Sequence, residues 1–300
     1  MIVVNGSDKY RRDDAPSVLC MGNFDGVHLG HQKILKAAVD AAKECGGRSA
    51  LYTFDPHPVK IIAPESAPKL IQTEAQKAAA IGACGIDVLV VENFTKDYAE
   101  VEPQDFFSEY IIKRIAPTHI VVGYDFTFGF HRHGTVETLR DLGRANNIGV
   151  SIVDAVFDDD TLISSSQIRK FIGLGNIEGA NKLLGRPYSI AGVVEKGRGL
   201  GGEIGVHTAN LDFENELIPA EGVYITQALG KKAVTNIGPN PTFAGNKLTI
   251  ETHILDYSGK LYGKKLEVEF FAKIRDEIKF GSADELKKQI EKDIKIARKY

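Results

Sequence analysis

The stretch that decides the fold is GNFDGVHLGH, which occupies residues 22–31. It follows an apolar run at 17–21 that predicts a buried strand, and it precedes an amphipathic run at 31–44 that predicts a helix. Glycines let the backbone approach a ligand closely, and a helix start offers unpaired N–H groups and a positive dipole end. His28 and His31 can donate hydrogen bonds to phosphate oxygens, so we interpret the stretch as a phosphate-binding loop rather than a turn with two solvated histidines. Its other candidate ligand-binding residues are Gly22, Asn23, Phe24, Gly26 and Gly30.

The rest of the first half alternates apolar strands with amphipathic helices. Strands are predicted at 50–54, 87–91, 118–123 and 149–153, and helices at 74–83, 104–115 and 135–146. Such alternation implies a parallel sheet with right-handed crossovers. We expect a doubly wound α/β domain over residues 1–184.

After Gly185 the pattern changes to short strands in which apolar and polar residues alternate. The clearest lie at 247–255 and 266–274, each with one apolar face, as in an antiparallel sheet or small barrel. A helix is expected from about Ser282, which forms a capping box with Glu285. Its buried stripe is expected at Leu286, Ile290 and Ile294, and the second domain at 185–300.

Composition narrows the class of protein. The length of 300 residues fits two domains of about 100–200 residues each. The 37 basic and 40 acidic residues give a net charge of −3, which argues against a basic face for nucleic acid. No apolar run approaches the ~20 residues that span a bilayer, and the first residues lack a signal-peptide layout. We expect a soluble cytoplasmic protein without nucleic-acid or membrane partners. The oligomeric state is left open.

The three cysteines, Cys20, Cys45 and Cys84, are odd in number and widely spaced. They form neither a disulfide framework nor a zinc-binding pattern, so we expect ordinary thiols.

Three further segments agree with the loop at 22–31. Residues 53–58 read TFDPHP, residues 123–129 read GYDFTFG with Arg132 and Gly134 after them, and residues 163–169 read ISSSQIR. Together with the HxGH pattern of His28 and His31, they resemble the bacterial FAD synthetases, the two-domain riboflavin kinase/FMN adenylyltransferases. The resemblance implies a Rossmann-like nucleotidyltransferase domain followed by a small antiparallel, riboflavin kinase-like β-barrel with a C-terminal helix.

In that family a phosphate oxygen of FMN attacks the α-phosphorus of ATP, which gives FAD and pyrophosphate. The resemblance implies that His28 and His31 face the triphosphate, that Arg169 holds its far end, and that Mg²⁺ bridges its oxygens. No protein nucleophile is needed, because the attacking phosphate is already anionic. Catalysis is then positioning together with stabilisation of charge.

The other candidates of the first domain are assigned to the nucleotide or the flavin. Three serines precede an apolar-periodic stretch, so they form an N-cap run that presents N–H groups; a plain cap is the alternative. His57 lies on a stiff loop between two prolines, where a surface histidine is the alternative, and the aromatic residues after the strand at 118–123 either contact flavin or pack in the core. These candidates are Ser164, Ser165, Ser166, His57, Asp125, Phe126 and Phe128.

The second half resembles a riboflavin kinase domain. Where the family has PTAN, which binds Mg²⁺ and phosphates, this chain reads HTAN at 207–210, and the resemblance implies Thr208 and Asn210 as metal ligands. Glu251, in ETH at 251–253, is implied as the general base for the riboflavin hydroxyl, with a solvated strand glutamate as the alternative. Arg275 is assigned to ligand binding by the same resemblance.

This second motif departs from the family pattern. His207 replaces the proline and Val206 the aromatic residue before it, and basic or hydroxyl residues are lost nearby. The positions concerned are Leu200, Gly202, Glu203 and Asn240. Two outcomes stay open: a bifunctional enzyme that acts on ATP, FMN and riboflavin, or an FMN adenylyltransferase whose degenerate kinase domain binds flavin or is regulatory. Two further functions are less favoured alternatives: a different small-molecule nucleotidyltransferase, and a non-enzymatic flavin-binding regulator.

Overall fold

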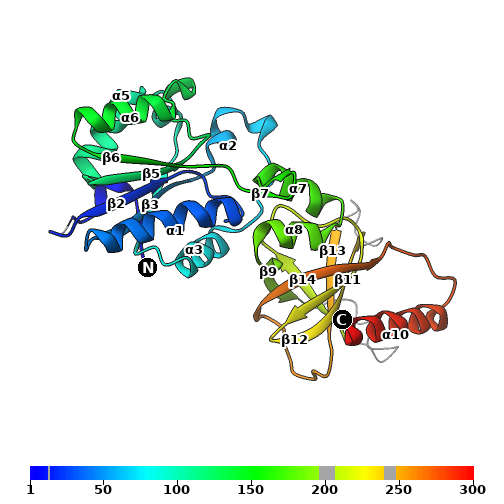
Figure 1. Ribbon diagram of the computed structural model, residues 1–300. Coiled ribbons are helices and arrows are strands. Elements are labelled where there is room, and N and C mark those ends of the chain that lie inside the picture. Colours follow the sequence, from blue (N-terminus) through cyan, green and yellow to red (C-terminus); the bar gives the residue numbers. More distant parts are fainter. Residues whose placement is uncertain (13, 196–206, 240–247) are drawn as a thin grey trace. The chain divides into compact units, whose positions relative to one another are not determined.

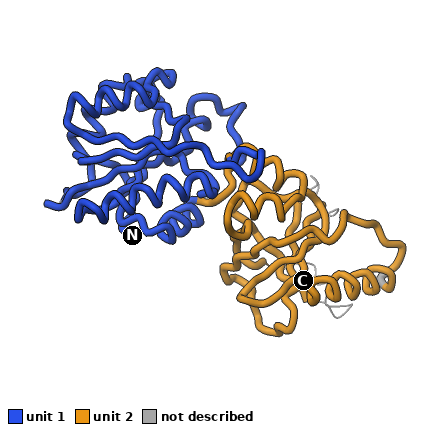
Figure 2. The backbone as a smooth tube through the Cα atoms, viewed as in Figure 1, with its two compact units in different colours: residues 1–69, 74–163 blue, residues 70–73, 164–300 orange. Residues whose placement is uncertain are grey.

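The computed structural model describes residues 1–12, 14–195, 207–239 and 248–300 (Figure 1). The chain forms two compact units, Met1–Lys69 with Glu74–Ile163, and Leu70–Thr73 with Ser164–Tyr300 (Figure 2). The division therefore falls at Ile163/Ser164, some twenty residues before the predicted boundary at 184/185. Among the described residues, no helix is both long and apolar enough to cross a membrane.

The first unit is built on a six-stranded parallel sheet in the order β1-β4-β3-β2-β5-β6. Its strands are β1 (Ile2–Asn5), β2 (Ser17–Met21), β3 (Arg48–Asp55), β4 (Val88–Asn93), β5 (His119–Gly123) and β6 (Gly149–Val153). From β2 the chain builds the sheet outward through β3 and β4, and later returns to place β5 on the other side of β2. The strand order thus switches between β2 and β5, and ligands bind at such switch points outside the carboxyl ends of strands. The expected doubly wound sheet is confirmed.

Helices cover both faces of this sheet (Figure 1). On one face α1 buries Leu35 and Ala38 and α3 buries Ile81, in a core with Cys20 and Leu51 of the strands. The other face buries the alternate strand residues against η3 and α6. The bounds of the helices are α1 (Leu29–Glu44), α2 (Pro58–Ile62), α3 (Glu74–Ala83), α4 (Lys96–Ala99), α5 (Pro103–Asp105), η3 (Phe106–Ile115) and α6 (Val136–Ala145), with 3₁₀ turns η1 (Ser7–Lys9), η2 (Pro64–Ser66) and η4 (Phe130–Arg132) and a small hairpin of β7 (Phe157–Asp158) and β8 (Thr161–Leu162).

One predicted helix takes a different form. The expected α-helix at 104–115 is a single turn, α5, continued by the π-helix η3. The Ala116 N–H closes it on the Ile111 carbonyl at 2.8 Å, with Ala116 in the left-handed region at φ 52°. Apolar spacing alone did not distinguish the wider i→i+5 winding, because both windings bury Phe106, Phe107, Ile111 and Ile115.

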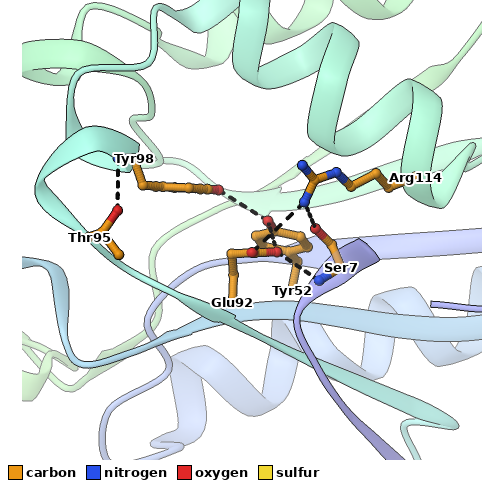
Figure 3. Close-up of polar contacts among 6 residues, drawn as sticks. All are labelled: Ser7, Tyr52, Glu92, Thr95, Tyr98 and Arg114. Carbon is orange, nitrogen blue, oxygen red and sulfur yellow. Dashed lines mark hydrogen bonds and ion pairs between the residues drawn. The ribbon is translucent and has the colours of Figure 1, made fainter. Parts of the chain in front are cut away.

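A buried polar network lies on the η3 face of the sheet (Figure 3). Oε2 of Glu92 accepts hydrogen bonds from the Tyr52 hydroxyl and the Ser7 N–H, both at 2.8 Å. The Tyr98 hydroxyl is 3.1 Å from that of Tyr52, and Arg114 donates to the Ser7 hydroxyl at 2.9 Å. Burial raises the pKa of Tyr52 and Tyr98, so both phenols stay protonated donors. The network satisfies a carboxylate that would otherwise be costly to bury.

The second unit contains a closed six-stranded antiparallel barrel in the order β10-β13-β12-β11-β14-β9. Two helices precede it and one follows it. Within β13 and β14 most of the predicted apolar faces are buried, as at Ile250 and Phe270, while the residues between them are not. The exceptions are Leu248 and Ile274 near the strand ends, which are only half-buried. The bounds are α7 (Ser165–Gly173), α8 (Ile177–Leu184), β9 (Tyr188–Glu195), β10 (Ala209–Phe213), β11 (Gly222–Ala228), β12 (Lys231–Pro239), β13 (Leu248–Ile254), β14 (Lys265–Arg275) and α10 (Ala283–Lys299).

The C-terminal helix begins as predicted but packs differently. Ser282 caps it by accepting the Glu285 N–H at 3.3 Å, whereas the Glu285 carboxylate accepts from Gly281 rather than from Ser282. The expected stripe of Leu286, Ile290 and Ile294 is only half-buried. The fully buried residues of α10 are Asp293 and Ala297, so a polar contact replaces part of the expected apolar packing.

Candidate functional site

The loop between β2 and α1 is a tight turn held in unusual backbone conformations. Phe24 has φ 51° and Val27 φ 39°, and Gly26 lies at φ 89°. A positive φ is uncommon for phenylalanine and costly for a β-branched valine. The Val27 N–H donates to the Phe24 carbonyl at 3.3 Å, which closes the turn. The loop therefore carries backbone strain at the switch point of the sheet, where a ligand is expected.

His28 is the N-cap of α1. Its Nδ1 accepts the backbone N–H of His31 at 3.3 Å, a bond that serine or aspartate usually supplies. A ring nitrogen that accepts carries no proton, so the neutral imidazole holds its proton on Nε2. The ring is 6% exposed. The predicted phosphate-facing histidine is thus locked as an Nε2–H donor at the positive end of a 16-residue helix.

His31 and Gly30 complete the predicted HxGH geometry. The rings of His28 and His31 stack with centroids 3.6 Å apart and planes inclined by 18°. The Phe24 ring is also close to His31, with centroids 5.0 Å apart and planes inclined by 49°. A Cβ on Gly30 would lie 3.1 Å from two atoms of the His28 ring, so glycine leaves the space that this ring occupies. The structure thus brings Phe24, His28, Gly30 and His31 together, and their contact with phosphate stays a prediction.

His57 repeats the arrangement of His28. It caps α2, and its Nδ1 accepts the Val59 N–H at 3.3 Å, so its neutral form also holds the proton on Nε2. The ring is half-buried. Two histidines of the first unit therefore have the same tautomer fixed by a backbone amide.

The segment after β5 divides into exposed and buried residues. Asp125 is exposed, and Phe126 is half-buried. Phe128 is 7% exposed and packs against Phe106 in the core, with centroids 5.6 Å apart. Its place in the core favours the packing alternative for Phe128, whereas Asp125 and Phe126 follow a strand at the switch point.

The serine run begins α7. Ser164 is the cap, and its hydroxyl accepts the Gln167 N–H at 3.3 Å. Ser165 and Ser166 form the first turn, and Arg169 lies half-buried one turn on. The N-cap prediction is confirmed, and the assignment of these residues to a triphosphate stays a prediction.

The second unit groups the predicted kinase residues on neighbouring strands. Glu251 of β13 stands opposite Asn210 of β10 in the strand register. The Thr208 hydroxyl donates to Oε2 of Glu251 at 3.4 Å. A hydroxyl, an amide oxygen and a carboxylate are the oxygen ligands that Mg²⁺ accepts beside substrate phosphates. Among the described residues no group of three or more His, Cys, Asp or Glu is placed to hold a metal, so an ion here would rely on this mixed donor set.

Two residues beside Glu251 are not among the predicted site residues. Asn236 of β12 is its register partner on the other side. Glu277 lies over Gly238, where a Cβ would be 3.0 Å from its Oε1. The pKa of Glu277 is raised above its ordinary value, because the effect of desolvation exceeds the opposing effects of a hydrogen bond with Asn236 and of the charge of Arg275. Residue spacing alone does not place Asn236 beside Glu251, whereas the barrel register does.

Arg275 is engaged inside the protein. Its guanidinium pairs with Asp293 of α10 at 2.9 and 3.1 Å and donates to the Asp276 carbonyl at 3.0 Å. The two side chains of the ion pair are only 15% and 2% exposed. Arg275 therefore ties the last barrel strand to the C-terminal helix, and its predicted contact with a ligand stays untested.

The altered kinase loop is described only in part. His207 is exposed, and the His253 ring donates from Nδ1 to its carbonyl at 2.8 Å. The other departures from the family pattern, Leu200, Gly202, Glu203, Val206 and Asn240, lie outside the described residues.

A parallel sheet with a glycine-containing loop and a helix start at its switch point is the arrangement of a nucleotide-binding protein, and here one chain joins it to a closed barrel. Residues 10–167 match the family model described as FAD synthetase, and residues 184–300 match the one described as riboflavin kinase. The chain belongs to the family of bifunctional riboflavin kinase/FMN adenylyltransferases.

Full-length relatives agree with this assignment. A bifunctional riboflavin kinase/FMN adenylyltransferase of Bacillus subtilis is 38% identical, covering 97% of this chain and 94% of its own. The protein of the same name from Escherichia coli K12 is 33% identical, with 94% and 92% covered. A solved structure from Streptococcus pneumoniae, titled macrolide-efflux protein, superposes with a TM-score of 0.91 at 32% identity over 100% of both chains. The predicted fold and the predicted FAD synthetase family are confirmed.

Proposed function

We propose that this chain makes FAD by transferring AMP from ATP to FMN. A phosphate oxygen of FMN forms a bond to the α-phosphorus of ATP, the bond to the β-phosphate bridge oxygen breaks, and pyrophosphate leaves. The observation that carries the proposal is the Nδ1 cap of His28, because it leaves Nε2–H as the donor of a nearly buried imidazole at the start of α1.

The protein's part is to bind and to stabilise charge. Negative charge grows on the leaving pyrophosphate, and donors that are already oriented stabilise it without further reorganisation. His28 and His31, stacked and fixed by the cap, supply two such donors, and the dipole of α1 adds a favourable field. Mg²⁺, when bound, neutralises phosphate charge.

Further residues are proposed to bind the substrates. Arg169 and the first turn of α7 present a guanidinium and backbone amides suited to phosphate. His57 offers an Nε2–H donor fixed in the same way as that of His28. Asp125 and Phe126 are proposed to contact the nucleotide or flavin. We also propose that the enzyme acts in the cytoplasm, where ATP is available, and that its partners are small molecules alone.

We propose riboflavin phosphorylation as the second activity. Glu251 would take the proton of the riboflavin hydroxyl as that oxygen bonds to the γ-phosphorus of ATP and ADP leaves. Thr208 and Asn210 would hold Mg²⁺ with the phosphates. The contact of Thr208 with Glu251, and the register pairing of Glu251 with Asn210, favour an intact kinase site over a degenerate one.

One assay tests both activities. The purified full chain is incubated with MgATP and either FMN or riboflavin, and the flavins are separated by chromatography. FAD from FMN supports the first activity, and FMN from riboflavin supports the second. Glu251→Gln, which keeps the size of the side chain, should abolish FMN formation and leave FAD formation from FMN intact. Flavin binding without any product would favour the regulator instead.

A further inference from the structure

The phosphate loop is fastened to the sheet by a buried hydroxyl. Thr53 of β3 is 0% exposed, and its Oγ1 donates to the Asn23 carbonyl at 3.2 Å. Valine would fill the same volume without a polar group, and a hydroxyl is costly to bury unless it is hydrogen-bonded. Packing alone therefore does not account for threonine at this position, and its hydrogen bond to the loop does.

The other end of the loop is fastened from α1. Nε2 of Gln32, in the first turn, donates to the Val27 carbonyl at 2.9 Å. Thr53 and Gln32 thus each hold one loop carbonyl, at the entry and at the exit of the strained turn.

Holding these carbonyls also sets the direction of two amides. In a trans peptide the C=O and the following N–H point in opposite directions. The Phe24 N–H therefore points away from Thr53, and the His28 N–H points away from Gln32. The Val27–His28 peptide adjoins the capping residue of α1, so it is held close to the His28 ring. The Asn23–Phe24 peptide is held by Thr53 at the start of the same turn.

We propose that Thr53 and Gln32 are positioning residues for adenylyl transfer, which orient the Phe24 and His28 amides and the His28 imidazole toward the phosphates of ATP. This inference rests on the proposed FMN adenylyltransferase activity. Both residues act through the loop and neither contacts the reacting atoms, so their loss should weaken phosphate stabilisation and leave FMN binding unchanged.

The test compares three variants of the full chain in the FMN adenylylation assay. Thr53→Val removes the donor at constant volume, Thr53→Ser keeps it, and Gln32→Met removes the donor at the other end. Ser49→Ala is the matched control, because Ser49 is a buried residue of the same strand whose hydroxyl bonds Asp87 at 2.8 Å, far along β3 from the loop.

Thr53→Val and Gln32→Met should each lower kcat/KM for ATP about tenfold, the order expected from one intramolecular hydrogen bond, with KM for FMN changed by less than about twofold. Thr53→Ser should retain most of the wild-type kcat/KM for ATP, and Ser49→Ala should change only the melting temperature. Wild-type kinetics in Thr53→Val, or no rescue in Thr53→Ser, would overturn the inference. If Thr53→Val fails to fold, Gln32→Met decides by the same criteria.

A failure of the proposed FMN adenylyltransferase activity can be distinguished from a failure of the positioning role. If the wild type forms no FAD, the activity is wrong, and calorimetric binding of MgATP then decides the inference. Weaker binding to Thr53→Val than to Ser49→Ala would support a positioning role at a phosphate site, and equal binding would overturn it.

Discussion

Nδ1 of His28 accepts the backbone N–H of His31 at 3.3 Å, and the two imidazoles stack with centroids 3.6 Å apart. One side chain thus begins the helix, fixes its own tautomer and holds its neighbour. This explains why the two histidines are separated by two positions, since the N-cap acceptor meets the third amide of the helix. Gly30, which lies between Leu29 and His31, then has to leave room for the His28 ring.

Gly30→Ala tests that requirement for space. A Cβ here would lie 3.1 Å from Cε1 and Nδ1 of His28, so the ring must shift. Alanine is a better helix former than glycine by about 1 kcal/mol, so the fold should be unharmed or stabilised. We expect FAD turnover to fall about tenfold or more while the melting temperature holds or rises. Unchanged turnover would mean that the position of the ring does not matter.

Asp293→Ala tests the ion pair that joins α10 to the barrel. The variant leaves Arg275 buried without its partner, a loss of about 3–5 kcal/mol. We expect a clear drop in the unfolding temperature of the second unit by calorimetry and little change in the first. The double variant Arg275→Met/Asp293→Leu should recover much of the loss, because no charge then stays unpaired. If the second unit of Asp293→Ala unfolded at the wild-type temperature, the role given to this ion pair would be contradicted.

A second ion pair, between Asp256 and Arg298 of α10, lies at the surface and can be compared with the buried pair. The Arg298 guanidinium binds Asp256 at 2.7 and 2.9 Å and lowers its pKa below the ordinary value. Because the folded pKa is the lower one, the stabilisation is present above the unfolded pKa of about 3.9 and is lost as the pH falls through the folded pKa. Asp256→Asn should therefore lower the melting temperature slightly at neutral pH and not in acid. Salt should reduce the difference, since both side chains are exposed. A pH-independent difference would contradict this cause.

The cysteines should differ in reactivity. Burial raises the pKa of the Cys20 thiol well above its usual range, whereas Cys45 is exposed. Since the thiolate is the reactive form, a chromogenic disulfide reagent should label Cys45 rapidly in the native protein and Cys20 only after unfolding. Cys45→Ser should remove the fast phase. Rapid native labelling of Cys20 would show that β2 opens.

Local patterns predicted much of the fold and the first site. The strand, glycines and histidines around His28 are consecutive in the chain, and Ser164 and Ser282 cap helices at the predicted points because capping depends on neighbours only. His28 as the cap shifted the start of α1 to Leu29, two residues before the predicted one.

Contacts between distant segments could not be predicted in the same way. Thr53 reaches Asn23 only because β3 lies beside β2, and Asn236 lies opposite Glu251 only because of the barrel register. Arg275 is assigned to a ligand by its motif alone. Its partner Asp293 lies in the next element along the chain, α10, and no sequence pattern predicts the ion pair between them. Strand order and helix packing supply these contacts, and residue spacing does not encode them directly.

The most direct test of the central claim is FAD and pyrophosphate formation from FMN and MgATP by the full chain and by His28→Asn. Asparagine is a good N-cap, so α1 should survive while the imidazole donor is lost. We predict equal amounts of FAD and pyrophosphate from the wild type, and a turnover lower by about 10²-fold or more in His28→Asn, at a wild-type melting temperature and with FMN binding retained. Wild-type turnover in His28→Asn would contradict the role of His28 as the phosphate donor.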